Sequence, residues 1–264
     1  MAKHSKKSRR LSLPERCFYG SRFRCLLLTH QGRRECAHDL SKIISPHGEV
    51  SSDDLWMPNG FTSPQEAELR STDRLVDSRQ CKLLQTWWLA VKKNPRTPSW
   101  DIASRAAIKT PEGNRPGILL VEAKAHEGES KGMKDVCDSE NSSNRESIAS
   151  AIHEANTGLA NCLPGRWALS PKSHYQLANR FAFSWKLAEL GVPVVLVYLG
   201  FLNASEMENG KRKLWKTHDD WERWLRDYSK AAVPESVWGN TVMINGTPFT
   251  PLIRSLDLNW HVGP

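Results

Sequence analysis

The sequence predicts an α/β fold in which a mixed central β-sheet is flanked by helices, with additions at the N- and C-terminal ends. Two nearly continuous apolar runs, GILLV at 117–121 and VPVVLVYLGFL at 192–202, have the composition of buried strands. A helical pattern at 173–191 lies between them, and this order is normally a right-handed crossover between parallel strands. The residues before the first run predict an antiparallel hairpin, which makes the sheet mixed.

Charge divides the chain into a short basic tail and one domain. The protein has 264 residues and a net charge of +8, and all of this excess lies in residues 1–36. We expect residues 1–14 to be a disordered basic tail and residues 15–264 to form a single domain. The positive charge favours a polyanion such as nucleic acid, although a solvated tail without a partner is the commoner case.

Cysteine usage and hydropathy indicate the compartment. The six cysteines form no C-x-x-C pair and no even cluster, which predicts free thiols in a reducing cytoplasm. No apolar stretch reaches the length of a membrane span, so we expect a soluble intracellular protein without a membrane partner.

Helical periodicity is clearest outside the two apolar runs. The strongest pattern, at 173–191, has Ser173 as its expected cap and Gly191 at its exit. A short apolar run is present at 25–30, and a small terminal hairpin is expected at 241–253. Further helices are predicted at 35–44, 78–93, 145–160 and 217–230.

One more helix is expected to begin near residue 64. Ser63 can cap this helix, Pro64 suits its first position, and Glu66 can complete a capping box with Ser63. The sequence therefore places an acidic helix shortly before the predicted hairpin.

The turn-rich stretch TPEGNRP separates the two strands of the predicted hairpin. Folding the chain about residue 113 sets Asp101 opposite residues 124–126. The polar segment 127–144 that follows is too long for an ordinary connection, and it predicts a mobile loop beside this strand end.

Two charged residues occupy the end of the first buried strand. Successive strand side chains point to opposite faces, so Glu122 and Lys124 share a face with Ile118 and Leu120. Burying such charges is costly unless they are paired, bind a metal or open onto a cleft. A salt bridge at a strand end is the simplest explanation, but the nearby Asp101 favours a functional site.

This constellation resembles a known nuclease family. Asp101 in SWD, the hairpin, and EAK at 122–124 are similar to the PD-(D/E)XK nuclease superfamily, which has a restriction-endonuclease-like core. The resemblance covers about residues 64–202. Trp100 stands where the family usually has a proline, and Pro98 lies nearby.

The resemblance implies a metal site and a catalytic lysine. Asp101 and Glu122 would bind Mg²⁺, or Mn²⁺ in its place, and the Ala123 carbonyl would complete the metal shell. Lys124 would orient or deprotonate the attacking water and stabilise charge on the phosphate.

The resemblance also suggests assisting residues. The family often adds a glutamate from its first core helix, and because Glu66 is explained as a capping partner, Glu68 is the candidate. Gln176 and Arg180 lie one helical turn apart and could face the site, or could belong to a solvated helix face. His126 has no spaced partner and is expected to be structural.

The implied activity is that of a Mg²⁺-dependent nuclease hydrolysing phosphodiester bonds in DNA, an endonuclease of restriction or repair type. DNA and RNA both remain open as substrates, and a homodimer is compatible with the sequence. The alternative is a catalytically inactive nuclease-fold protein that binds nucleic acid or a protein partner. Retention of Asp101, Glu122 and Lys124 favours the enzyme, because an inactive relative has no chemical reason to keep all three.

Overall fold

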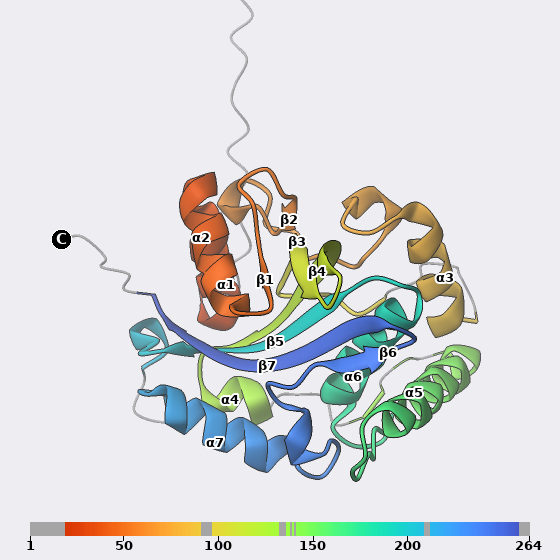
Figure 1. The fold of residues 1–264 in the computed structure, drawn as a ribbon. Coiled ribbons are helices and arrows are strands. Elements are labelled where there is room, and N and C mark those ends of the chain that lie inside the picture. Colours follow the sequence, from red (N-terminus) through yellow and green to blue (C-terminus); the bar gives the residue numbers. More distant parts are fainter. Residues whose placement is uncertain are drawn as a thin grey trace, which may run out of the picture.

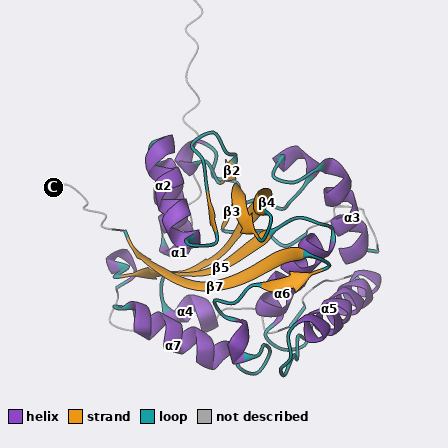
Figure 2. Ribbon diagram, in the orientation of Figure 1, coloured by secondary structure: helices purple, strands orange, loops and turns teal. Residues whose placement is uncertain are grey.

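The computed structural model of the chain describes residues 19–90, 97–131, 136–137, 139, 141–208 and 212–258. At its centre is a seven-stranded mixed β-sheet with helices on both faces (Figure 1, Figure 2), which confirms the predicted mixed α/β class. The predicted basic tail at residues 1–14 lies outside the described residues. Within the described ranges, no helix has the length and apolar character needed to cross a membrane.

The strands are β1 (Gly48–Glu49), β2 (Trp56–Met57), β3 (Ile102–Thr110), β4 (Gly113–Lys124), β5 (Val194–Leu202), β6 (Val242–Ile244) and β7 (Thr247–Asp257). Their order in the sheet is β1-β3-β4-β5-β7-β6, and β2 also pairs with β3. The β3–β4 pair is antiparallel, whereas β4–β5 and β5–β7 are parallel. The predicted hairpin and the predicted parallel crossover are both confirmed.

The helices of the described residues are α1 (Gly20–His30), α2 (Arg33–Ile44), α3 (Ser78–Trp88), α4 (Glu127–Lys131), α5 (Ser142–Cys162), α6 (Tyr175–Glu189) and α7 (His218–Ser229). Helices α1 and α2 cover one face of the sheet, and α5, α6 and α7 cover the other (Figure 1). The helices predicted from periodicity are all found, although α3 ends earlier than expected.

Side-chain alternation along β4 agrees with the sequence pattern. Ile118 and Leu120 belong to the core shared with α3, α5 and α6, whereas Leu119 and Val121 belong to the core beneath α1 and α2. Glu122 continues the first series, so it points toward the α6 side of the sheet.

The turn of the β3–β4 hairpin differs from the predicted one. The chain reverses at Pro111–Glu112, so that Thr110 pairs with Gly113. The Thr110 hydroxyl donates a hydrogen bond to the Gly113 carbonyl over 2.8 Å and accepts one from the Glu112 N–H over 3.3 Å. Gly113 itself has φ +117°, a backbone conformation that suits glycine at such a turn.

The corrected register changes the neighbour of Asp101. Ile102 lies opposite Val121, which puts Asp101 level with Glu122. The prediction that Asp101 lies opposite residues 124–126 is therefore wrong, because it assumed a turn centred too far along the chain.

The helix predicted to begin near residue 64 is also wrong, because residues 63–70 contain no helical turn and Leu69 has φ +52°. Ala67 forms an isolated bridge with Trp100, whose N–H donates to the Ala67 carbonyl over 2.9 Å. Ala67 and Leu69 are buried in the core that contains Trp100, while the residues beside them are more exposed. Contact with the core outweighs the local capping signal.

Three smaller boundaries also differ. His174, not Ser173, is the N-cap of α6, while Gly191 follows the helix with φ +83°, as expected for a glycine at this position. The terminal hairpin is larger than predicted, because β7 pairs with β5 along Val194–Leu202. The apolar run at 25–30 belongs to α1.

The segment 127–144, predicted to be a mobile loop, is helical at both ends, because α4 occupies its beginning and α5 starts at Ser142. Within this segment, residues 132–135, 138 and 140 lie outside the described residues. The connection therefore contains two helical pieces where the sequence predicted none.

Gly200 marks a point of close packing between β5 and α7. A Cβ atom at Gly200 would lie 2.5 Å from the ring of Trp221, which is too close for any side chain. We expect Gly200→Ala to lower the free energy of unfolding by about 1 to 3 kcal/mol in urea denaturation. Trp221→Leu should lower the free energy of unfolding less in the Gly200→Ala background than in the wild type, because the smaller side chain relieves the clash. Strictly additive losses in the double variant would contradict this explanation.

Candidate active site

Asp101, Glu122 and Lys124 meet at one end of the β3–β4 hairpin. Asp101 directly precedes β3, and its Oδ2 accepts a hydrogen bond from the Ala123 N–H over 2.7 Å. Asp101 is level with Glu122 in the hairpin, and the charges of Glu122 and Lys124 both act on its carboxyl group. The structure thus brings the three predicted residues together.

Glu122 is the centre of a buried ion cluster. Its side chain is 1% exposed and that of Lys124 is 8% exposed. Glu122 Oε1 accepts a hydrogen bond from the Lys124 ammonium, and Oε2 accepts one from Arg180 Nε over 2.7 Å. Both carboxylate oxygens therefore have cationic donors, which offsets the several kcal/mol that burying a charge costs.

Arg180 reaches this cluster from α6. Its NH2 group donates to the Ser99 carbonyl over 2.6 Å, and its NH1 group donates to Asn179 Oδ1 over 3.1 Å. The guanidinium carbon lies 4.5 Å from the centre of the Trp100 ring. Arg180 is buried beside Glu122, so it does not belong to a solvated helix face, which was the other alternative.

Gln176 lies one turn before Arg180 and is partly buried. Its Oε1 is buried and has no hydrogen-bond partner within the described part of the chain. Arg180, rather than Gln176, is the α6 residue that contacts Glu122 in this structure.

The surroundings separate the titration of the two carboxyl groups. Burial, followed by the charge of Glu122, raises the pKa of Asp101 to about 6. Burial also opposes ionisation of Glu122, but Lys124 and Arg180 outweigh it and lower the pKa of Glu122. Burial similarly opposes the charge on Lys124, yet Glu122 and Asp101 raise its pKa. Near neutral pH the Glu122–Lys124 pair is ionised, and Asp101 is the member that titrates closest to neutrality.

Asp101→Asn should stabilise the fold at pH 8. Folded Asp101 binds its proton more tightly than the unfolded chain does, so wild type gains stability as the pH falls through about 6, whereas the variant does not. We expect the variant to unfold with a free energy up to about 3 kcal/mol higher at pH 8, and the difference to vanish below about pH 4. Urea denaturation at both pH values measures this, with the exposed Asp53→Asn as control. A pH-independent difference would contradict the assignment.

Glu129 on α4 was not singled out by the sequence, although it fixes the end of the strand. It accepts a hydrogen bond from the Ala125 N–H over 2.6 Å and another from the Ser21 N–H over 2.9 Å. These bonds tie the residue after β4 to the beginning of α1. No sequence pattern predicts these two hydrogen bonds, because they form only when the short helix α4 folds back onto the end of β4.

Two further residues lie close to the cluster. Cys25 of α1 is buried, and burial, followed by the charge of Asp101, raises the pKa of its thiol. Tyr198 is the neighbour of Glu122 on β5 and is completely buried. A parallel alignment of the two apolar runs in the sequence could have predicted that Tyr198 lies beside Glu122. The position of Cys25 could not be predicted in this way, because it belongs to a helix far away in the sequence.

Glu68 gains no support as an assisting residue. Glu68 forms an ion pair with Arg70, and Glu66 forms one with Arg22. Because residues 63–70 are not helical, the capping argument that favoured Glu68 over Glu66 no longer applies.

His126 lies at the junction of β4 and α4. Its ring is buried, and its Nδ1 accepts a hydrogen bond from the Gly128 N–H over 2.9 Å at the start of α4. Burial lowers the pKa of His126.

The donor set of the site is small but suited to a hard cation. The carboxylates of Asp101 and Glu122 lie at the same end of the hairpin, Asp101 bonded to the Ala123 N–H, and oxygen ligands are what Mg²⁺ prefers. Nowhere in the described residues do three or more His, Cys, Asp or Glu side chains gather in an arrangement that could hold a metal. Any metal bound here would therefore rely on backbone, solvent or substrate oxygens for its remaining ligands.

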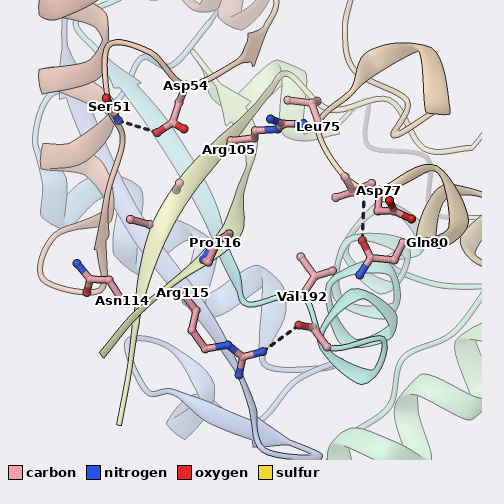
Figure 3. A pocket seen from close by; sticks show the side chains of 15 residues that line it. Ser51, Asp54, Leu75, Asp77, Gln80, Arg105, Asn114, Arg115, Pro116 and Val192 are labelled. Carbon is pink, nitrogen blue, oxygen red and sulfur yellow. Dashed lines mark hydrogen bonds between the residues drawn. The ribbon is translucent and has the colours of Figure 1, made fainter. Parts of the chain in front are cut away.

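A cavity of about 710 Å³ lies near the other end of the hairpin, between β3, β4 and the beginning of α3 (Figure 3). Its rim contains both acidic and basic side chains, and its two arginines donate to backbone carbonyls, Arg105 to Arg74 and Arg115 to Gly191. None of the predicted site residues lines this cavity.

Comparison with known proteins adds no identification. A scan against protein-family models found no match, and searches of curated proteins and of solved structures found none either. The functional argument therefore depends on the residues of this chain and their geometry.

Proposed function

We propose that the protein is a Mg²⁺-dependent endonuclease that hydrolyses phosphodiester bonds in DNA, of restriction or repair type. The observation that carries the proposal is the meeting of Asp101, Glu122 and Lys124 at one end of a β-hairpin. A hairpin followed by a crossover to a parallel strand is also the arrangement that the restriction-endonuclease-like resemblance implies.

The residues present fit a divalent cation. Burial, followed by the charge of Glu122, raises the pKa of Asp101, and a cation bound between the two carboxylates would offset both effects. Asp101, Glu122 and the Ala123 carbonyl would hold the ion. When bound, Mg²⁺ would neutralise charge on the phosphate and make water more acidic.

Lys124 is best suited to electrostatic stabilisation. Its pKa is raised by Glu122 and Asp101, so its ammonium keeps its protons and is a poor general base. Directed at a phosphate, it would donate hydrogen bonds to the oxygens on which negative charge develops. Arg180 would keep Glu122 oriented while Lys124 turns toward the substrate.

A second candidate is a catalytically inactive nuclease-fold protein that binds nucleic acid or a protein partner. One observation favours it: Lys124 and Arg180 already satisfy both oxygens of Glu122, so the ion cluster is complete without a metal. The two candidates differ in whether any phosphodiester bond is cleaved.

Metal removal tests the activity. The purified full chain should cleave plasmid, linear or branched DNA with Mg²⁺ or Mn²⁺, and EDTA should abolish cleavage because the carboxylates alone cannot stabilise the phosphate charge. Glu122→Gln should lose activity, since a neutral amide is a poor ligand for a hard dication. Glu112→Gln, on the exposed turn of the same hairpin, is the matched control. DNA binding without cleavage under every metal condition would support the inactive alternative, and RNA in the same assay tests the other substrate class.

A further inference from the structure

Trp100 packs directly against the candidate site. Its side chain is completely buried, and its backbone N–H donates to the Ala67 carbonyl over 2.9 Å. Arg180 lies over the face of the ring, with its guanidinium carbon 4.5 Å from the ring centre. An indole face attracts a cation through the ring quadrupole, most strongly where water is excluded.

The contacts of Arg180 show what the ring contributes. Three nitrogens of the guanidinium donate within its plane, to Glu122, Asn179 and Ser99. These bonds fix the direction of the group, and Trp100 supports its flat face. A lysine could not replace Arg180 here, because its ammonium has neither the planar fork nor the stacking surface.

The indole nitrogen of Trp100 is buried and has no hydrogen-bond partner within the described residues. The same is true of Trp56, Trp185 and Trp215, so this nitrogen does not distinguish Trp100. The contact of its ring face with Arg180 is what ties Trp100 to the site.

We propose that Trp100 is a positioning residue, which holds Arg180 against Glu122 and so orients the carboxylate that would receive the metal. This inference rests on the proposed nuclease function for its catalytic consequence, but the positioning itself does not depend on activity. It assigns a task to the residue that stands where the resembled family usually has a proline.

Two substitutions separate the ring face from simple packing. Trp100→Phe keeps an aromatic face, and Trp100→Leu keeps apolar volume without one. The first readout is metal-free: the Arg180 Nε–H signal in NMR, assigned by its loss in Arg180→Lys. We expect this signal to persist in wild type and Trp100→Phe and to broaden or disappear in Trp100→Leu, because the guanidinium becomes free to reorient.

The second readout is Mn²⁺ titration of the full chain without DNA. We expect Trp100→Leu to weaken Mn²⁺ binding by about tenfold or more and Trp100→Phe by less than about threefold. In cleavage assays Trp100→Leu should lower kcat with little change in KM. Arg180→Lys should reproduce the Mn²⁺ effect, and combining it with Trp100→Leu should add little, which provides a test even if Trp100→Leu folds poorly.

The outcomes distinguish this inference from the proposed function. An intact Arg180 signal and unchanged Mn²⁺ binding in Trp100→Leu would overturn the positioning role and leave Trp100 as core. Additive losses in the double variant would overturn it as well. If wild type neither binds Mn²⁺ nor cleaves DNA, the nuclease proposal fails, whereas the Arg180 signal still decides whether Trp100 holds the arginine.

Discussion

Lys124→Met is expected to reduce DNA cleavage by about 10²- to 10⁴-fold, the range typical for loss of one group that stabilises charge in the transition state. Methionine keeps the length and apolar body of lysine but removes the ammonium. Glu122 retains Arg180 as a partner, so the proposed metal ligands should stay in place. Single-turnover cleavage under saturating Mg²⁺ measures the effect on the chemical step.

Lys109→Met is the matched control, because Lys109 is an exposed lysine on the other strand of the same hairpin. It should leave cleavage unchanged. DNA binding by Lys124→Met should also stay close to wild type, since the lost interaction is made mainly in the transition state. If Lys124→Met cleaved DNA at the wild-type rate, the Glu122–Lys124 pair would have only a structural role.

Arg180→Met is expected to lower the free energy of unfolding by about 3 to 5 kcal/mol, the range for breaking a buried ion pair from one side. The variant leaves Glu122 buried with one cation instead of two, and it removes the donor to the Ser99 carbonyl. Chemical denaturation at neutral pH measures the loss.

Two comparisons make this expectation specific. Arg223→Met removes a cation that is 72% exposed, so it should cost no more than about 1 kcal/mol. Adding Glu122→Gln to Arg180→Met should lower the stability further, because the buried Lys124 ammonium then loses its carboxylate partner. A loss of the same size in Arg180→Met and Arg223→Met would show that the buried cluster contributes little to stability.

Much of the scaffold was predictable because it follows from short-range periodicity. The two-residue alternation along 117–124 places Glu122 and Lys124 on one face whatever the rest of the chain does. Strand, helix, strand order likewise restricts β4 and β5 to a parallel crossover. These patterns are local, and burial of the apolar side chains enforces them.

The misplaced elements share a physical cause. The capping signal at Ser63 is worth only about 1 kcal/mol, and the core contacts of Ala67 and Leu69 with the Trp100 segment outweigh it. In the hairpin, turn bonding by Thr110 shifted the register, and no pattern in the strands themselves opposed the shift.

By itself, the sequence determined which residues of the hairpin could do chemistry, since Asp101, Glu122 and Lys124 are charged groups attached to an apolar strand pair. Only the tertiary structure decided what compensates their burial. Arg180 and Trp100 are far apart in the sequence, and they meet Glu122 because the crossover returns α6 over the end of β4. A buried charge needs partners in space, and sequence periodicity carries no information about which distant side chain will supply them.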